Sequence, residues 1–180
     1  MKRLFIQFLL TILSTNVAFG QNPIITFEKV TTEVAANNPF FGDFSAEIHD
    51  PGDTASVKVP VKKDLPDTMR MKGIFEFDGA SIAEFDITLC EAFENEEFAK
   101  DLLSHGIPKD KFPKKCPAMT GMDYELHKYK FQPEKLPPNT PDGKFSGVIS
   151  VYESDKDPYA SVSFEGTISH KLPQAPGFGR

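Results

Sequence analysis

The sequence predicts a mainly β domain, an antiparallel two-sheet β-sandwich or β-cup with one short helix between its two cysteines. Three observations lead to this prediction. Several segments alternate apolar and polar residues with the period of two that half-buried strands show. Prolines and glycines in turn-forming contexts separate these segments. One further segment has the pattern of a helix, and it lies between Cys90 and Cys116.

The alternation is clearest in five segments, namely 55–61, 70–78, 83–89, 144–151 and 160–169. Each segment offers one apolar face, and an antiparallel sheet with one solvated face explains that better than a parallel sheet does. The dipeptide Asp78-Gly79 between the second and third segments is a strong signal for a tight hairpin.

Two other segments have a strand pattern that is less regular. Residues 24–30 are expected to form a first strand. In 124–131, Tyr124 and Leu126 share one face, whereas Tyr129 and Phe131 fall on the other. This change of phase near His127–Lys128 predicts a β-bulge.

The predicted helix begins after Asn95, a residue suited to an N-cap, and two glutamates follow where the helix dipole favours acids. Phe98 and Leu102 are four residues apart and therefore share one face. Gly106 predicts the end of the helix.

The first 20 residues have the features of a secretory signal peptide. Lys2 and Arg3 precede an apolar run that is too short to span a bilayer, and small residues lead to a cleavage site after Gly20. We therefore expect a secreted, extracellular protein with one domain over 21–172 and a flexible tail over 173–180. In an oxidising compartment, Cys90 and Cys116 are expected to form a disulfide.

Composition and motifs argue against several function classes. The net charge of −6 makes nucleic acid a poor partner, because its affinity comes from cationic contacts with phosphate. The four histidines are scattered without zinc-binding spacing, and the chain has no G-x-S-x-G or Walker motif. We therefore predict no catalytic residues, no metal ligands, no cofactor and no enzymatic activity.

Aromatic content is the feature that most needs an explanation. The chain has 17 phenylalanines and no tryptophan. These rings can fill a closed core, or they can surround a cavity that holds an acyl chain, in which each buried CH₂ contributes about 0.8 kcal/mol. The residues alone leave the two alternatives open.

The second half of the chain resembles the ganglioside activator protein family and its insect relatives, within the lipid-recognition β-sandwich superfamily. The matching residues occur in the family's order and spacing over about 80 residues: Cys116-Pro117, Gly121, Tyr124, Leu126, Lys130-Phe131 to Leu136-Pro137, Gly143-Lys144-Phe145, and Ser163 to Ile168 with Gly166. The resemblance implies a β-cup whose apolar cavity takes up lipid tails without catalysis. It also matches Cys90 and Cys116 to two cysteines of the family.

The chain departs from this family in two respects. It lacks the additional disulfides of the activator, with Ala160 about where one of those cysteines would fall, and it lacks tryptophan, which the activator carries in a membrane-touching loop. Insect relatives with few cysteines are the nearer comparison, and some are linked to chemosensation. These departures argue against ganglioside binding and membrane insertion, and any contact with a membrane is expected to be transient.

Two functions follow from these observations. The first is a secreted lipid-binding or lipid-transfer protein, with Phe40 and Phe41 or the Cys90–Cys116 loop as a lid at the cavity mouth. Its predicted cavity residues are Val57, Val59, Phe75, Phe77, Phe85, Ile87, Phe98, Leu102, Phe131, Phe145, Ile149, Val151 and Phe164. The second is a protein-binding module of chemosensory or venom type with a filled core, which would use the Phe40–Phe41 patch and the Leu136–Pro141 loop as contact surfaces.

Overall fold

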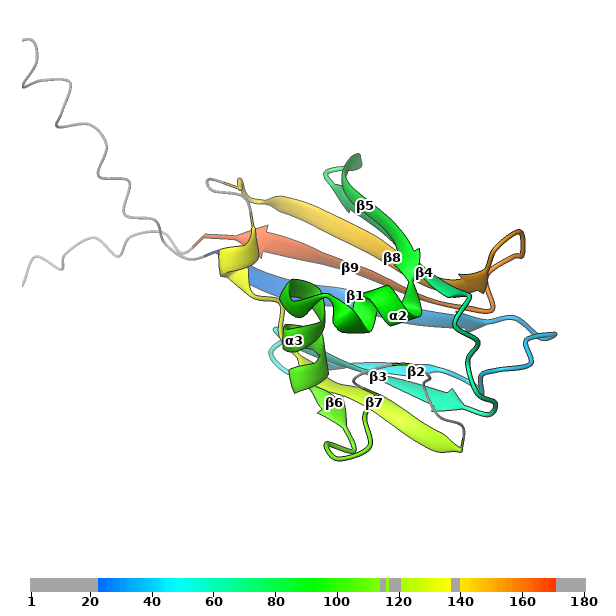
Figure 1. The fold of residues 1–180 in the computed structure, drawn as a ribbon. Helices are drawn as coiled ribbons and strands as arrows, with labels where there is room; N and C mark the ends of the chain where they lie inside the picture. The colour runs from blue at the N-terminus through cyan, green and yellow to red at the C-terminus, as the bar shows by residue number, and fades with distance from the viewer. Residues whose placement is uncertain (1–22, 114–115, 117–120, 137–139, 171–180) are drawn as a thin grey trace, which may run out of the picture.

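The structure, a computed structural model, describes residues 23–113, 116, 121–136 and 140–170. The predicted signal peptide over 1–20 and the predicted tail over 173–180 lie outside these ranges. The described part of the chain forms two antiparallel sheets that face each other, with two α-helices at one side (Figure 1). The predicted two-sheet β architecture is confirmed.

The larger sheet has five strands in the order β1-β9-β8-β4-β5. Its strands are β1 (Ile24–Val34), β9 (Ala160–Ser169), β8 (Gly143–Glu153), β4 (Met69–Phe77) and β5 (Ala80–Thr88). The hairpin between β4 and β5 turns at the predicted dipeptide, where Asp78 and Gly79 both have a positive φ, 47° and 78°. Positive φ at both central residues is the geometry that two-residue hairpins prefer.

The smaller sheet has four strands in the order β2-β3-β7-β6. Its strands are β2 (Ser45–His49), β3 (Thr54–Val61), β7 (Met122–Tyr129) and β6 (Gly106–Ile107). Strands β2 and β6 were not among the predicted segments. They have five and two residues, which is too short for a period of two to stand out.

Strand β7 carries the predicted bulge. Ala55 of β3 pairs with Tyr129 of β7 and Val57 pairs with Leu126, so β7 advances by three residues where β3 advances by two. Lys128 has φ 48°, and its backbone N–H donates to the Ser56 hydroxyl at 2.9 Å. The extra residue changes the phase of the strand, and Tyr129 therefore faces inward with Leu126. The prediction that these two residues lie on opposite faces is wrong.

The predicted helix is present as α3 (Glu96–Ser104), and a shorter helix, α2 (Leu89–Glu94), precedes it. The sequence prediction missed α2, although the spacing of Thr88 and Glu91 is that of a capping box. The Glu91 N–H donates to Thr88 Oγ1 at 3.1 Å, and the Thr88 N–H donates to Glu91 Oε2 at 2.7 Å. These reciprocal bonds stabilise the first turn of a helix of only six residues.

The two sheets are joined differently at their two sides. On one side, the Phe27 N–H of β1 donates to the Gly52 carbonyl in the β2–β3 turn at 2.7 Å. On the other side, α2 follows β5 of the larger sheet and α3 leads into β6 of the smaller sheet (Figure 1). The Cys90–Cys116 disulfide is confirmed, with 5.4 Å between the Cα atoms, and ties α2 to the segment that precedes β7.

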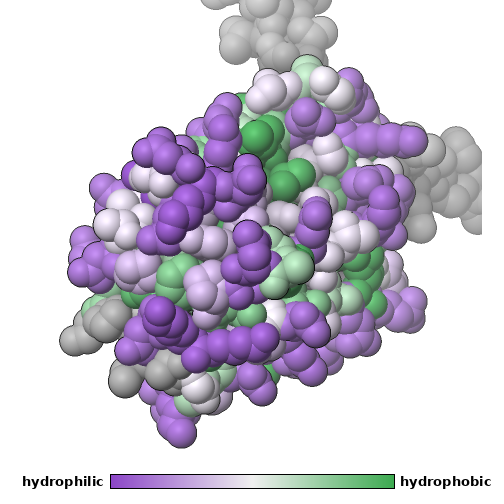
Figure 2. All heavy atoms as spheres, turned by 90° about the vertical axis from the view of Figure 1, so that its right-hand side faces the viewer, coloured by the Kyte–Doolittle hydropathy of each residue, from purple (hydrophilic) through white to green (hydrophobic). Residues whose placement is uncertain are grey.

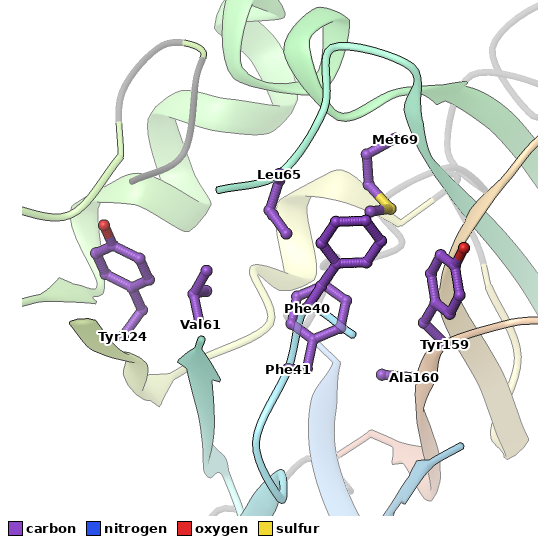
Figure 3. Packing of buried hydrophobic residues seen from close by; sticks show 8 residues of the cluster. All are labelled: Phe40, Phe41, Val61, Leu65, Met69, Tyr124, Tyr159 and Ala160. Carbon is purple, nitrogen blue, oxygen red and sulfur yellow. The ribbon is translucent and has the colours of Figure 1, made fainter. Parts of the chain in front are cut away.

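Buried hydrophobic residues gather at one end of the molecule and close it. We call this cluster the plug, and it comprises Phe40, Phe41, Val61, Leu65, Met69, Tyr124, Tyr159 and Ala160 (Figure 3). Phe41 and Met69 are 2% and 0% exposed, and the rings of Phe40 and Tyr159 meet edge to face at 5.2 Å. From outside, this end is mostly hydrophilic, with apolar patches between the polar side chains (Figure 2).

Candidate ligand-binding cavity

A cavity of about 320 Å³ lies between the two sheets and extends away from the plug. The larger sheet contributes Phe27, Val30, Met71, Phe75, Ile149, Val151, Ala160, Val162 and Phe164. The smaller sheet contributes Ala55, Val57, Val59, Val61, Tyr124, Leu126 and Tyr129. Phe131, two residues beyond the end of β7, also lines the cavity. The remaining wall consists of Phe41, Phe44 and Leu65 near the plug and of Leu89, Phe93, Leu102, Phe112 and Pro113 from the helical side.

The inner faces of the sheets surround this space and do not fill it. Val57 and Val59 of β3 are only half-buried although both line the cavity, as are Ile149 and Val162 of the opposite sheet. Side chains that interdigitate in a closed core lose nearly all their exposure, as Phe41 and Met69 do in the plug. The domain therefore has a filled end and a hollow end.

Glycines in the larger sheet let phenylalanine rings lie close to its inner surface. Gly147 of β8 is directly opposite Phe164 of β9, and Gly166 of β9 is directly opposite Phe145 of β8. In each pair the ring occupies the space that a Cβ atom on the glycine would take. Rings that lie over glycine in this way extend less far toward the other sheet, and so leave room between the sheets.

The lining is apolar apart from two phenol groups, those of Tyr124 and Tyr129, and none of the lining residues that the structure describes carries a charge. The Tyr129 hydroxyl donates to Asp101 Oδ2 at 3.3 Å, and Gln132 Nε2 donates to Asp101 Oδ1 at 2.5 Å. Burial is the main cause that raises the pKa of Tyr129 above its usual range, and the negative charge of Asp101 raises it further. The phenol therefore stays protonated at any physiological pH.

The structure brings together eight of the thirteen predicted cavity residues. These are Val57, Val59, Phe75, Leu102, Phe131, Ile149, Val151 and Phe164. Four others, Phe77, Phe85, Ile87 and Phe145, are not among the described lining residues. The side chain of Phe98 in α3 is outside the described part of the structure.

The four excluded residues share the inner face of the larger sheet but do not border the hollow. Phe85 and Ile87 belong to β5, the edge strand of the larger sheet, and Phe85 covers Gly73. Phe77 covers Gly143, and Phe145 covers Gly166 and packs on Phe27 at 5.9 Å between ring centroids. A period of two assigns these residues to a face, but it does not say which part of that face lies opposite the other sheet.

The predicted mouth is wrong for Phe40 and Phe41. Both are buried in the plug, at 7% and 2% exposed, and the N–H groups of both donate to Asn38 Oδ1, at 3.0 and 2.6 Å. They close one end of the cavity because the loop that carries them folds inward. The other predicted lid, the Cys90–Cys116 loop, contributes Phe93, Leu102, Phe112 and Pro113 to the cavity wall.

Several lining residues were missed by the sequence prediction. Val162 lies two residues before Phe164 in the same alternating segment, so the period of two already indicated it. Phe27 and Val30 both line the cavity because the register of β1 shifts between Phe27 and Lys29, and no feature of the sequence indicates that shift. A strict period of two puts Tyr129 on the wrong face, because the bulge at Lys128 adds one residue to β7 before it.

One group of metal-type ligands occurs in the described residues, Asp67 with Cys90 and Cys116. Both sulfurs belong to the disulfide, so they are not available as thiolate ligands. Among the helices that the structure describes, neither is long and apolar enough to cross a membrane. The chain matches no protein-family model, and no curated protein matches its sequence.

Proposed function

We propose that this protein is a secreted, non-enzymatic lipid-binding or lipid-transfer protein that holds an acyl chain in the cavity between its sheets. The observation that carries the proposal is the hollow of about 320 Å³ with an apolar lining. Ligand pockets have volumes of about 300–1,000 Å³ and predominantly hydrophobic walls. At about 0.8 kcal/mol for each buried CH₂, a long chain gains enough to bind without covalent chemistry.

The alternative, a protein-binding module with a filled core, has less support. Its core would have to be closed, whereas the inward side chains of β3 and β8 are half-buried around a hollow. One of its two expected contact surfaces, Phe40 and Phe41, is buried in the plug. The other, the Leu136–Pro141 loop, includes residues 137–139 outside the described part of the structure.

Secretion is a part of this proposal that rests on the sequence. The signal-like first 20 residues support secretion, and so does the disulfide, because disulfides persist in oxidising compartments. The resemblance to insect relatives of the ganglioside activator protein supports transport of a hydrophobic small molecule.

Native mass spectrometry of protein purified without detergent tests the proposal directly. We expect co-purifying fatty acid, phospholipid or another lipid, released on denaturation and identified in an organic extract. Delipidated protein should then bind a fluorescent lipid. Protein that is free of lipid and does not bind the fluorescent probe would refute the proposal.

Two variants on neighbouring residues separate cavity binding from surface binding. Ile149→Trp adds bulk inside the cavity, whereas Val148→Trp adds it to the outer face of the same strand, where Val148 is 39% exposed. We expect Ile149→Trp to weaken lipid binding by about tenfold or more and Val148→Trp to leave it unchanged. Equal effects of both substitutions would place the lipid elsewhere.

A further inference from the structure

The two lining residues that carry a hydroxyl group belong to opposite ends of the cavity. Tyr124 and Tyr129 are five residues apart on β7, which places their positions on the order of 15 Å apart along the strand. Tyr124 belongs to the plug and is 5% exposed. Tyr129 is at the end away from the plug, because it pairs with Ala55 whereas Met122 pairs with Val61 of the plug.

The Tyr129 hydroxyl has its proton directed at a fixed acceptor. Its hydroxyl donates to Asp101 Oδ2, and Asp101 is itself held by the Gln132 side chain. The ring of His105 packs edge to face on the ring of Tyr129 at 5.4 Å, which fixes its position further. A phenol oxygen whose proton is already used still has lone pairs that accept hydrogen bonds. Because Tyr129 lines the cavity, its phenol oxygen is the candidate acceptor for a ligand at this end.

An acceptor at this position selects among lipid headgroups. A hydroxyl headgroup can donate its proton to the Tyr129 oxygen. An ester has no proton to donate, and an ionised carboxylate has none either. The carboxylate would also lie near the negative charge of Asp101 without a cation among the lining residues to offset it, and an unpaired charge is costly to bury.

We infer that the cavity selects an uncharged single-chain lipid with a hydroxyl headgroup, which donates a hydrogen bond to Tyr129 while its chain extends toward the plug. This inference rests on the proposed lipid-binding function and names the class of ligand. The chain would lie along Val57, Val59 and Ile149, which are apolar and half-buried. Asp101 acts through Tyr129 as a positioning residue.

Three ligands of equal chain length test the selection: hexadecanol, methyl hexadecanoate and hexadecanoate, each displacing a fluorescent phenylnaphthylamine probe at neutral pH. We expect hexadecanol to bind most tightly and hexadecanoate to bind at least about tenfold more weakly. Hexadecanoate binding as tightly as hexadecanol would overturn the inference and leave the proposed function intact. No binding by any of the three would overturn both.

Two tyrosine substitutions locate the headgroup. Tyr129→Phe removes the acceptor and keeps the ring, and we expect it to weaken hexadecanol binding about three- to tenfold while methyl hexadecanoate is unaffected. Tyr152→Phe removes a phenol of β8 that does not line the cavity and that is hydrogen-bonded to Asp86; it is the matched control, with hexadecanol binding unchanged. Thermal melting of both variants checks that they are folded. The inference is wrong if Tyr129→Phe leaves hexadecanol binding unchanged, or if Tyr152→Phe weakens it as much.

A charge substitution tests the exclusion of anions independently. Asp101→Asn keeps an oxygen acceptor for the Tyr129 hydroxyl but removes the negative charge. We expect it to improve hexadecanoate binding severalfold and thereby to reduce the preference for hexadecanol over hexadecanoate. Glu33→Gln, which removes an exposed carboxylate from β1, is the control for net charge. If the two variants change hexadecanoate binding equally, Asp101 has no specific part in the selection.

Discussion

The ring of Phe164 in β9 fills the space above Gly147 in β8, its directly opposite neighbour, where a Cβ atom would otherwise lie. The same arrangement joins Phe145 to Gly166, and Phe85 to Gly73 across β5 and β4. An aromatic ring that covers a cross-strand glycine shields its backbone and helps to set the strand register. Here the arrangement also keeps the phenylalanine rings close to the larger sheet, which leaves space for the cavity between the two sheets.

We predict that Gly147→Ala destabilises the protein and reduces ligand capacity. The new Cβ would overlap the Phe164 ring, which must then move into the cavity. Overpacking costs about 1–3 kcal/mol, which exceeds the roughly 0.4–1 kcal/mol that replacing glycine gains from the unfolded chain. Urea unfolding measures the change. A double-mutant cycle with Phe164→Leu should show coupling between the two positions, and simple additivity would contradict this explanation.

We predict that Ser56→Ala destabilises the bulge of β7. Ser56 is 6% exposed, and its hydroxyl accepts the backbone N–H of Lys128 at 2.9 Å. Without it, the part-buried N–H of Lys128 loses its partner, and a lost hydrogen bond of this kind costs about 0.5–1.5 kcal/mol. Urea unfolding should show this loss. Ser163→Ala, on the outer face of β9, is the control and should be nearly neutral.

Removal of the disulfide should both destabilise the fold and speed ligand release. Cys90 and Cys116 are 26 positions apart, and a cross-link over such a loop contributes about 3–4 kcal/mol in the chain-entropy model. The double variant Cys90→Ala with Cys116→Ala should lose about this amount in urea unfolding. It should also release a bound fluorescent lipid faster, because α2 and α3 cover one side of the cavity. Unchanged release would show that the ligand leaves by another route.

The capping box of α2 should make part of the stability depend on pH. The Thr88 N–H donates to the Glu91 carboxylate and has the larger effect, and the Thr88 hydroxyl also donates to it. Together they hold the pKa of Glu91 below its usual value of 4.5. A lowered pKa in the folded state means that the contribution is present above pH 4.5 and is lost as the pH falls through the folded value. Thermal melts of wild type and Glu91→Gln should differ most at neutral pH and converge in acid.

The matched control for this experiment is Glu94→Gln. It removes an exposed carboxylate from the last turn of the same helix. The difference between Glu94→Gln and wild type should not follow the pH profile of Glu91→Gln. If both variants give the same profile, the effect comes from net charge and not from the capping box.

Much of the fold could be predicted because alternation with a period of two reports burial on one face. That signal identified β3, β4, β5, β8 and β9, and it placed Val57, Val59 and Ile149 on inner faces. The same signal has no information about how far the opposite sheet extends. It therefore also predicts Phe85 and Ile87 as cavity residues, although they lie on an edge strand away from the hollow.

The rest of the cavity depends on local irregularities that a regular pattern cannot report. The register shift after Phe27 and the bulge at Lys128 each change which of the following residues face inward. These changes add Val30 and Tyr129 to the lining. The sequence does not predict the plug, for a related reason. Phe40 and Phe41 lie in a loop, and an apolar loop has the same sequence pattern whether it is exposed or folded inward.

The different connections at the two sides of the sandwich give the cavity unequal stiffness. Backbone hydrogen bonding between Phe27 and Gly52 holds the β1 side, whereas helices and one disulfide hold the β5 side. Strand ladders run within each sheet in the described residues, so a thicker ligand can tilt the sheets apart without breaking a ladder. In such a motion the β1 side would be the hinge, and the disulfide between Cys90 and Cys116 would limit the opening.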